Sequence, residues 1–154
     1  MAYLQRMVDG LLTELLESSG AVLIEGPKWC GKTTTATQQA ASILRLQNPD
    51  TREAYMATAK TKPSLLLRGE TPRLIDEWQI IPQLWDAVRM MVDDRNEMGQ
   101  FILTGSNSID NQDIMHTGTG RIARLRMHPM SLFETQESTG EISLKALFEN
   151  PNMD

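Results

Sequence analysis

Residues 26–33 constrain the fold of this 154-residue chain more than any other feature. They read GPKWCGKT and match the Walker A pattern G-x-x-x-x-G-K-[ST]. A short apolar run, residues 21–24, comes directly before them, and a segment with helical spacing begins at about Lys32. In this strand–loop–helix context, backbone N–H groups surround a polyphosphate at the positive end of the helix. A chance match has a probability on the order of 1% in a chain of this length, so a plain glycine turn is the weaker interpretation.

The residue types in the loop indicate how it would hold a nucleotide. Lys32, which we expect to be exposed to ligand rather than packed, would place a positive charge near the terminal phosphates. The Thr33 hydroxyl is suited to the accompanying Mg²⁺ ion. Trp29 and Cys30 also have simpler explanations, as an exposed loop tip and as a small residue that offers its backbone N–H. The predicted nucleotide-binding residues are Gly26, Pro27, Lys28, Trp29, Cys30, Gly31, Lys32, Thr33 and Thr34.

A second motif supports the first. The segment RLIDE, residues 73–77, predicts a strand that ends in two adjacent carboxylates. Parallel sheets bind their ligands at the edge formed by the carboxyl ends of the strands. Asp76 would hold the magnesium ion through water, and Glu77 would act as general base on a water beside the terminal phosphate. Considered alone, such a pair is usually a solvated strand end, but downstream of a phosphate loop the functional interpretation is favoured.

The acidic pair also separates classes of phosphate chemistry. A carboxylate that activates water would waste the ATP of a small-molecule kinase, so ATP hydrolysis is the favoured reaction. A nucleotide-dependent binding module that scarcely hydrolyses ATP stays open as an alternative, and a small-molecule kinase is a more distant one. GTP-binding proteins usually read guanine with an Asn-Lys-x-Asp run, and residues 61–64, TKPS, lack the acid.

Apolar spacing elsewhere predicts alternating helices and strands. Helices are expected over residues 2–19, 32–47, 63–68 and 81–92, and strands over 21–24, 54–57, 73–76, 101–103 and 122–127. Gly20 is expected to cap the first helix in the left-handed conformation, and Asn48 with Pro49 to close the second. Ser131 and Glu134 form a capping box that would open a further helix. The alternation predicts an α/β domain with a mostly parallel sheet.

Composition argues against several classes of protein. Fifteen basic and twenty acidic residues give a net charge of −5, so a global basic surface for nucleic acid is missing. Arg124 and Arg126 form a strip that could touch DNA, although acid pairing is the favoured explanation. One cysteine leaves no internal disulfide, and no apolar run approaches the roughly 20 residues of a membrane span. The first residues also lack the pattern of a secretory signal. We therefore expect a soluble, cytoplasmic protein.

Several segments, taken in order, match one known family. They are Tyr3 and Arg6 with Asp9, GAVLIEGPKWCGKTTTA over residues 20–36, LIDEWQ over 74–79, FILTGSNS over 101–108, and GRIARLRMHPMSLFE over 120–134. Across nearly its whole length the chain resembles the AAA-type ATPase domains at the N-terminus of bacterial and archaeal ATP-binding proteins that carry a C-terminal domain of unknown function. The resemblance implies a P-loop NTPase three-layer sandwich with an AAA-like central sheet, and ATP with Mg²⁺ as ligands.

The resemblance also implies roles outside the two motifs. Thr104 or Ser106, at the end of a strand, would sense the terminal phosphate or the attacking water. Arg121 would be an arginine finger for transition-state charge, of the kind often supplied by a neighbouring copy, so self-association is expected. Family members are usually longer and carry lid helices. Residues 1–154 are therefore expected to be a single ATPase domain, a fragment without lid and C-terminal domain, that serves as motor or switch for an effector whose target stays open.

Overall fold

Short strands of mostly apolar residues form the centre of the molecule. The computed structural model describes residues 2–106, 120–142 and 144–149. Every described strand pairs in parallel, in the order β2-β3-β4-β1-β5. The strands are β1 (Ala21–Gly26), β2 (Ser42–Arg45), β3 (Arg73–Asp76), β4 (Phe101–Ser106) and β5 (Ile122–Arg126). The predicted α/β fold is confirmed, with a sheet that is wholly parallel over these strands.

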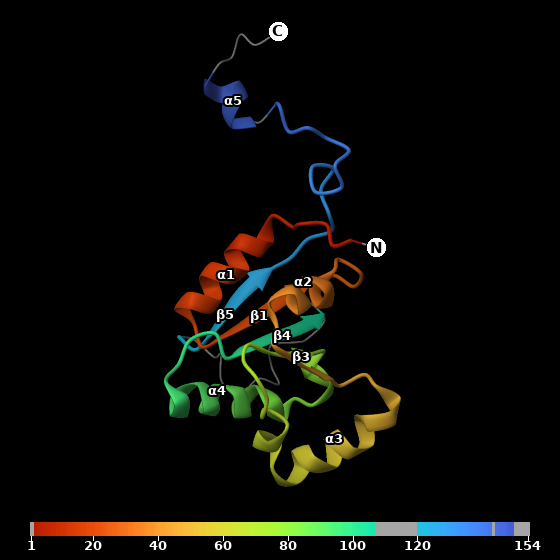
Figure 1. Ribbon diagram of the computed structural model, residues 1–154, viewed down its shortest axis with the longest axis vertical. Coiled ribbons are helices and arrows are strands. Elements are labelled where there is room, and N and C mark those ends of the chain that lie inside the picture. The colour runs from red at the N-terminus through yellow and green to blue at the C-terminus, as the bar shows by residue number, and fades with distance from the viewer. Residues whose placement is uncertain (1, 107–119, 143, 150–154) are drawn as a thin grey trace.

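Helices cover both faces of this sheet. The helices are α1 (Val8–Ser18), α2 (Lys32–Gln39), α3 (Pro49–Thr61), α4 (Gln83–Arg95) and α5 (Leu144–Glu149), with 3-10 turns η1 (Pro63–Leu65) and η2 (Trp78–Ile80). α1 and α2 lie on one face, and α3 and α4 on the other (Figure 1). Alternate residues of β1 enter the two cores, Leu23 with Trp85 of α4 and Val22 with Leu12 of α1. The predicted three-layer sandwich is confirmed, and burial on both faces explains the uninterrupted apolar run of β1.

The first helix is shorter than its apolar spacing predicts, because it begins at Val8 and ends at Ser18. The predicted left-handed cap at Gly20 is wrong. Ser19 ends the helix in an extended conformation, and Gly20 is not among the residues with positive φ. A Cβ at Gly20 would collide with the side chain of Val92 on α4. Close packing against α4, and not helix capping, therefore explains the glycine.

The predicted helix over residues 32–47 is wrong in its second half. α2 ends at Gln39, and residues 42–45 form the edge strand β2 beside β3. Ile43 and Leu44 consequently pack on opposite faces of the sheet, Leu44 with the α4 core and Ile43 against the α1 core. A short apolar run is compatible with the period of a helix and with that of a strand, and pairing with β3 selects the strand.

The predicted strand over residues 54–57 is also wrong, since these residues lie inside α3. Asn48 and Pro49 open this helix instead of closing the previous one. The Asn48 side chain accepts a hydrogen bond from the Asp50 N–H at 3.1 Å, and Pro49 occupies the first helical position. Both are standard helix-start positions for these residue types.

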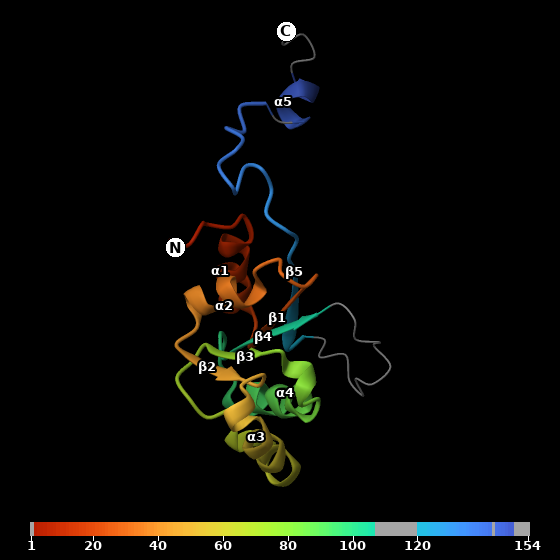
Figure 2. The same cartoon turned by 90° about the vertical axis from the view of Figure 1, so that its right-hand side faces the viewer.

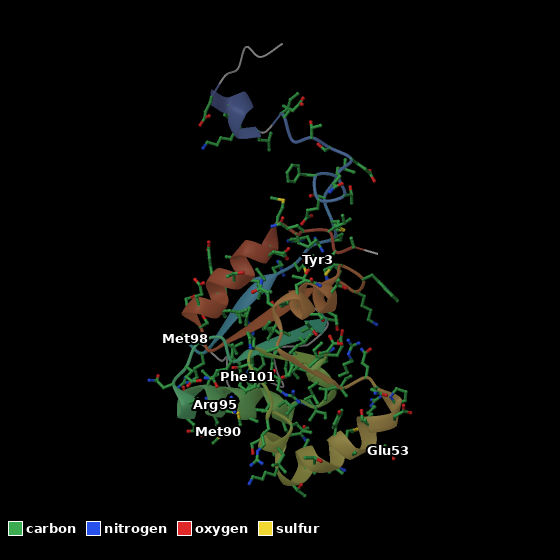
Figure 3. The ribbon with its side chains drawn as sticks, viewed as in Figure 1. Tyr3, Glu53, Met90, Arg95, Met98 and Phe101 are labelled. Carbon is green, nitrogen blue, oxygen red and sulfur yellow. The ribbon has the colours of Figure 1, made fainter. Side chains whose placement is uncertain are left out.

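The other predicted strands are confirmed as β1, β3, β4 and β5, and the helix over 81–92 is confirmed as α4. α4 ends at Arg95, and Asn96 caps it with a φ of 51°. The helix predicted over 63–68 is the single turn η1. Arg95 of α4 lies over the ring of Phe101 at 5.9 Å, both labelled in Figure 3. Two residues of the FILTGSNS segment, 107 and 108, lie outside the described residues.

The capping box at Ser131 and Glu134 forms, but the predicted helix does not, because the residues that follow make only a hydrogen-bonded turn. The Glu134 N–H donates to Ser131 Oγ at 3.3 Å, and the Ser131 N–H donates to Glu134 Oε2 at 2.7 Å. Gln136 then has a φ of 65°, and the chain closes with hydrogen bonds to carbonyls three and five residues earlier, a Schellman ending. We name residues 131–138 the exit turn, because it follows β5 where the chain leaves the sheet (Figure 2).

Candidate functional site

Three strand ends meet at one edge of the sheet. β1 ends at Gly26, β3 at Asp76 and β4 at Ser106, and Gly26 lies opposite Ser106 in the β1–β4 register. A pocket of about 620 Å³ opens at this edge. It is lined by Lys28, Trp29, Gly31, Lys32, Thr33, Thr34, Gln47, Glu77, Gln79 and Ser106. The predicted phosphate loop and the predicted base Glu77 therefore face the same pocket.

Backbone geometry explains two glycines of the loop. Gly31 has a φ of 96°, in the left-handed region that favours glycine, and it directly precedes α2. A Cβ at Gly26 would collide with the carbonyl oxygen of Met127, the residue after β5. Trp29 adopts a φ of 68° without being glycine, and 99% of its surface is exposed. Such strained residues persist only where the surroundings hold them, and they gather at ligand sites.

Lys32 is buried, contrary to our expectation of an exposed side chain. Its Nζ donates to the carbonyl oxygens of Gly26 at 2.9 Å and Pro27 at 2.8 Å, and the residue is 6% exposed. A buried ammonium group requires such acceptors, because burying a charge without partners is costly. Lys32 thus closes the loop on itself, with its charge at the pocket wall.

Asp76 connects the loop to the strand ends. Its Oδ1 accepts a hydrogen bond from Thr33 Oγ1 at 2.6 Å and another from Thr104 Oγ1 at 2.8 Å. Thr104 Oγ1 also accepts the N–H of Glu77 at 3.0 Å. Thr104 is fully buried, so it contacts Asp76 and Glu77 from behind and does not line the pocket. Ser106 does line it.

The hydroxyl of Thr33 and the carboxylate of Asp76 fit a magnesium ion. Mg²⁺ prefers oxygen ligands and is usually held by one or two carboxylates together with phosphate oxygens and water. Across the described part of the chain, no group of three or more His, Cys, Asp or Glu side chains could hold a metal ion. A magnesium ion beside Thr33 and Asp76 therefore depends on phosphate oxygens and water for its other ligands.

Glu77 is held by a neighbour to which the sequence analysis gave no role. Its backbone is left-handed, with a φ of 57°, and its side chain is half-buried. Gln79 Nε2 donates a hydrogen bond to Glu77 Oε2. Both side chains line the pocket. The spacing of two residues after an acid was visible in the sequence, but only the 3-10 turn η2 brings the amide back to the carboxylate.

Arg121 is not brought to this site. Its carbonyl oxygen accepts the N–H of Ala21, the first residue of β1. Gly26 lies five residues further along this strand, a distance of about 16 Å. The Arg121 guanidinium forms an ion pair with Asp93 on α4 at 2.6 Å. Within one chain, Arg121 therefore lies at the opposite edge of the sheet. Arg124, in the strip considered for DNA, pairs with Glu25 at 2.6 Å.

A second arginine, Arg6, contacts the loop although no role was assigned to it. It is 7% exposed, and its Nη1 donates to the carbonyl oxygen of Cys30 at 2.8 Å. Cys30 itself is buried in the core between α1 and the sheet, in keeping with its interpretation as a small loop residue. Arg6 was part of the family resemblance, but its contact with the loop spans a sequence separation that no local pattern shows.

Comparison with known protein families agrees with this geometry. A family model described as an AAA domain matches residues 18–136, which is more than half of the chain. The chain belongs to the AAA domain family. The matched region of the AAA domain begins at the end of α1, includes the loop and the Asp76–Glu77 pair, and reaches into the exit turn. A search of curated proteins found no match. None of the helices in the described part of the AAA domain has the length and apolar character needed to cross a bilayer.

Proposed function

We propose that this AAA domain binds ATP with Mg²⁺ and hydrolyses it, as the motor or switch of an effector domain. The observation that carries the proposal is the shared cluster at the strand ends. Asp76 accepts hydrogen bonds from Thr33 of the phosphate loop and from Thr104, and Thr104 in turn accepts the N–H of Glu77. These hydrogen bonds support the proposal, because they hold the residues proposed to bind the metal and to act as base in fixed relation to the loop, as phosphoryl transfer to water requires.

Different groups of the loop would bind different parts of MgATP. Backbone N–H groups between Lys28 and Thr34 would contact the phosphates at the N-terminus of α2. Lys32 would donate its hydrogen bonds to phosphate oxygens in place of the loop carbonyl oxygens. This exchange of acceptors requires no change in the fold. Thr33 and Asp76 would hold the magnesium ion, which when bound offsets charge on the phosphate oxygens.

Glu77 is the proposed general base. It would orient a water in line with the γ-phosphorus and take one proton from it as the new oxygen–phosphorus bond forms. The bond from the γ-phosphorus to the bridging oxygen breaks at the same time, and ADP and inorganic phosphate leave. Ser106 lines the pocket and would contact the phosphate or the water, whereas Thr104 would act through Asp76 and Glu77.

Phosphate release by the wild type, Glu77→Gln and Lys32→Ala tests the proposal. We expect turnover in the wild type and its loss in both variants, with MgATP binding kept in Glu77→Gln because the substitution preserves shape and leaves the loop untouched. Equal amounts of ADP and inorganic phosphate would distinguish hydrolysis from transfer to a small acceptor. Turnover in Glu77→Gln at the wild-type rate contradicts the assignment of the base.

One observation favours the alternative of a nucleotide switch with negligible hydrolysis. The Gln79 amide already occupies one oxygen of the Glu77 carboxylate. A hydrogen bond of this kind restrains the orientation of the carboxylate and leaves one oxygen fewer to accept a proton from water. MgATP binding without phosphate release above background in the wild type would establish the switch.

A further inference from the structure

The Arg6 guanidinium donates three hydrogen bonds to groups far from it in the sequence. Its Nη1 donates to the carbonyl oxygen of Cys30 in the phosphate loop, and its Nη2 to that of His128 after β5, both at 2.8 Å. Its Nε donates to Glu134 Oε1 in the exit turn at 3.0 Å. One planar guanidinium thereby joins the phosphate loop to the segment that follows β5. In Figure 1 the red N-terminal segment crosses beside the end of β5 and the orange loop.

The bond to Cys30 fixes the orientation of one loop peptide. In a trans peptide the C=O and the N–H of the following residue point in opposite directions. Because Arg6 holds the Cys30 carbonyl, the Gly31 N–H points away from Arg6. Gly31 lines the phosphate pocket, so this N–H belongs to the backbone that a phosphate would contact. A glycine on one side of a peptide makes its rotation easy, which is why an external restraint matters at this position.

The packing around Gly31 is an independent sign that the guanidinium and the loop fit together. A Cβ on Gly31 would approach Arg6 Nη1 to 3.2 Å, closer than ordinary side-chain contacts. Any side chain there would press on the guanidinium as well as strain the left-handed backbone, which has a φ of 96°.

Glu134 keeps Arg6 in place. Its Oε1 accepts the Met7 N–H at 2.8 Å besides Arg6 Nε, and its Oε2 accepts the N–H and the hydroxyl of Ser131 at 2.7 and 3.0 Å. Both partners of the ion pair are nearly buried, with 6% and 7% of their side chains exposed. Tyr3, labelled in Figure 3, anchors the same segment through its hydroxyl, 2.7 Å from Asp9 Oδ1.

We propose that Arg6 is a positioning residue of the nucleotide site, which directs the Gly31 N–H into the phosphate pocket and is itself held by Glu134 of the exit turn. This inference rests on the proposed nucleotide binding. Through Arg6 the exit turn is connected to the phosphate loop, so a displacement of the turn would change the affinity for phosphate. Arg6 touches no substrate and acts only through the backbone of residues 30 and 31.

Arg6→Lys and Glu134→Gln test the inference. Lysine keeps the charge but lacks the planar fork that reaches three acceptors at once. We expect MgATP to bind Arg6→Lys roughly tenfold more weakly, in line with the loss of one hydrogen bond to a charged ligand. Glu134→Gln keeps the shape of the side chain and removes its charge, so we expect a smaller weakening, of about threefold. The matched control is Arg124→Lys, the same change in the ion pair with Glu25, for which the affinity should stay unchanged.

The Gly31 amide resonance separates a positioning role of Arg6 from a purely structural one, because a purely structural role would leave the MgATP-induced shift of this resonance unchanged. In ¹⁵N–¹H spectra we expect MgATP to shift this resonance strongly in the wild type and less in Arg6→Lys. Unchanged MgATP affinity in Arg6→Lys, with only a lower melting temperature, overturns the inference while leaving the proposed function intact. Should Arg6→Lys fail to fold, unchanged affinity in Glu134→Gln overturns it equally. A wild type that does not bind MgATP overturns the proposed function, and this inference with it.

Discussion

Lys32 stabilises the loop without nucleotide and, in the proposed complex, binds phosphate, and unfolding measurements separate these two contributions. In the structure its Nζ holds the carbonyl oxygens of Gly26 and Pro27, and in the proposed complex it holds phosphate. We therefore expect Lys32→Ala to lose the stabilisation by MgATP, which for the wild type amounts to about 2.7 kcal/mol at a hundredfold excess over Kd. We also expect the free energy of unfolding without nucleotide to fall by about 1–3 kcal/mol, because buried acceptors lose a charged donor.

Thermal and urea unfolding with and without MgATP measure both effects. Lys60→Ala, an exposed lysine on α3, is the control and should keep the full ligand-induced stabilisation. An undiminished shift in Lys32→Ala would show that the loop is not the nucleotide site.

Gln79 donates a hydrogen bond to Oε2 of Glu77, the proposed base. We expect Gln79→Ala to raise the turnover number several-fold while the affinity for MgATP changes less than twofold, because a carboxylate freed from this donor can turn either oxygen toward the attacking water. Steady-state phosphate release measures this change, with Gln83→Ala on α4 as an exposed control. A fall in turnover comparable to that of Glu77→Gln would mean that Gln79 orients the base productively.

The exit turn is the element whose stability depends most clearly on pH. Burial of the Glu134 carboxyl opposes its ionisation, but hydrogen bonds from the Ser131 and Met7 N–H groups, from Arg6 and from the Ser131 hydroxyl prevail and lower its pKa from 4.5 to about 2. A lowered folded-state pKa contributes stability that is present above pH 4.5 and is lost as the pH falls toward 2.

We accordingly expect the wild type to be more stable than Glu134→Gln at pH 6, and the difference to shrink steadily between pH 4.5 and pH 2.5. Urea unfolding of the two proteins at a series of pH values measures it. A difference that is constant over this range would show that the charge of Glu134 contributes nothing to the turn.

At the scale of elements, the strands and motifs that are marked by a contiguous run of residues were predictable from the sequence. The features that depend on contacts between distant segments were missed. β1, β3 and β4 have short, continuous apolar runs of the kind found in strands that are covered on both faces. β2 was missed because Ile43 and Leu44 fit a helical stripe as well as a strand, and only the neighbouring β3 resolves the ambiguity. The loop and the Asp76–Glu77 pair are contiguous motifs, so they were predictable. The pair of Arg6 and Glu134 joins residues 128 positions apart, and no local spacing encodes it.

At the scale of the whole molecule, the position of Arg121 limits how it could serve catalysis. It lies at the edge of the sheet opposite the loop, so a finger role requires a second copy of the chain. We expect Arg121→Ala to keep the wild-type affinity for MgATP, because its guanidinium pairs with Asp93 on the surface. Turnover measured over a range of protein concentrations, alone and in a mixture with Lys32→Ala, tests the proposed self-association. Recovery of activity in the mixture supports it, whereas full activity of Arg121→Ala alone removes the finger.

The three tryptophans of the chain differ sharply in their surroundings. Trp78 and Trp85 are each 3% exposed and contact each other as tilted rings with centroids 4.9 Å apart, whereas Trp29 at the loop tip is 99% exposed. Acrylamide should therefore quench one emitter in three, the one that lines the phosphate pocket. We expect MgATP to protect this emission in the wild type and to leave it unprotected in Lys32→Ala, with Trp29→Phe as the blank. Under the proposed function, Trp29 would thus be an intrinsic fluorescent reporter of nucleotide binding that needs no added label.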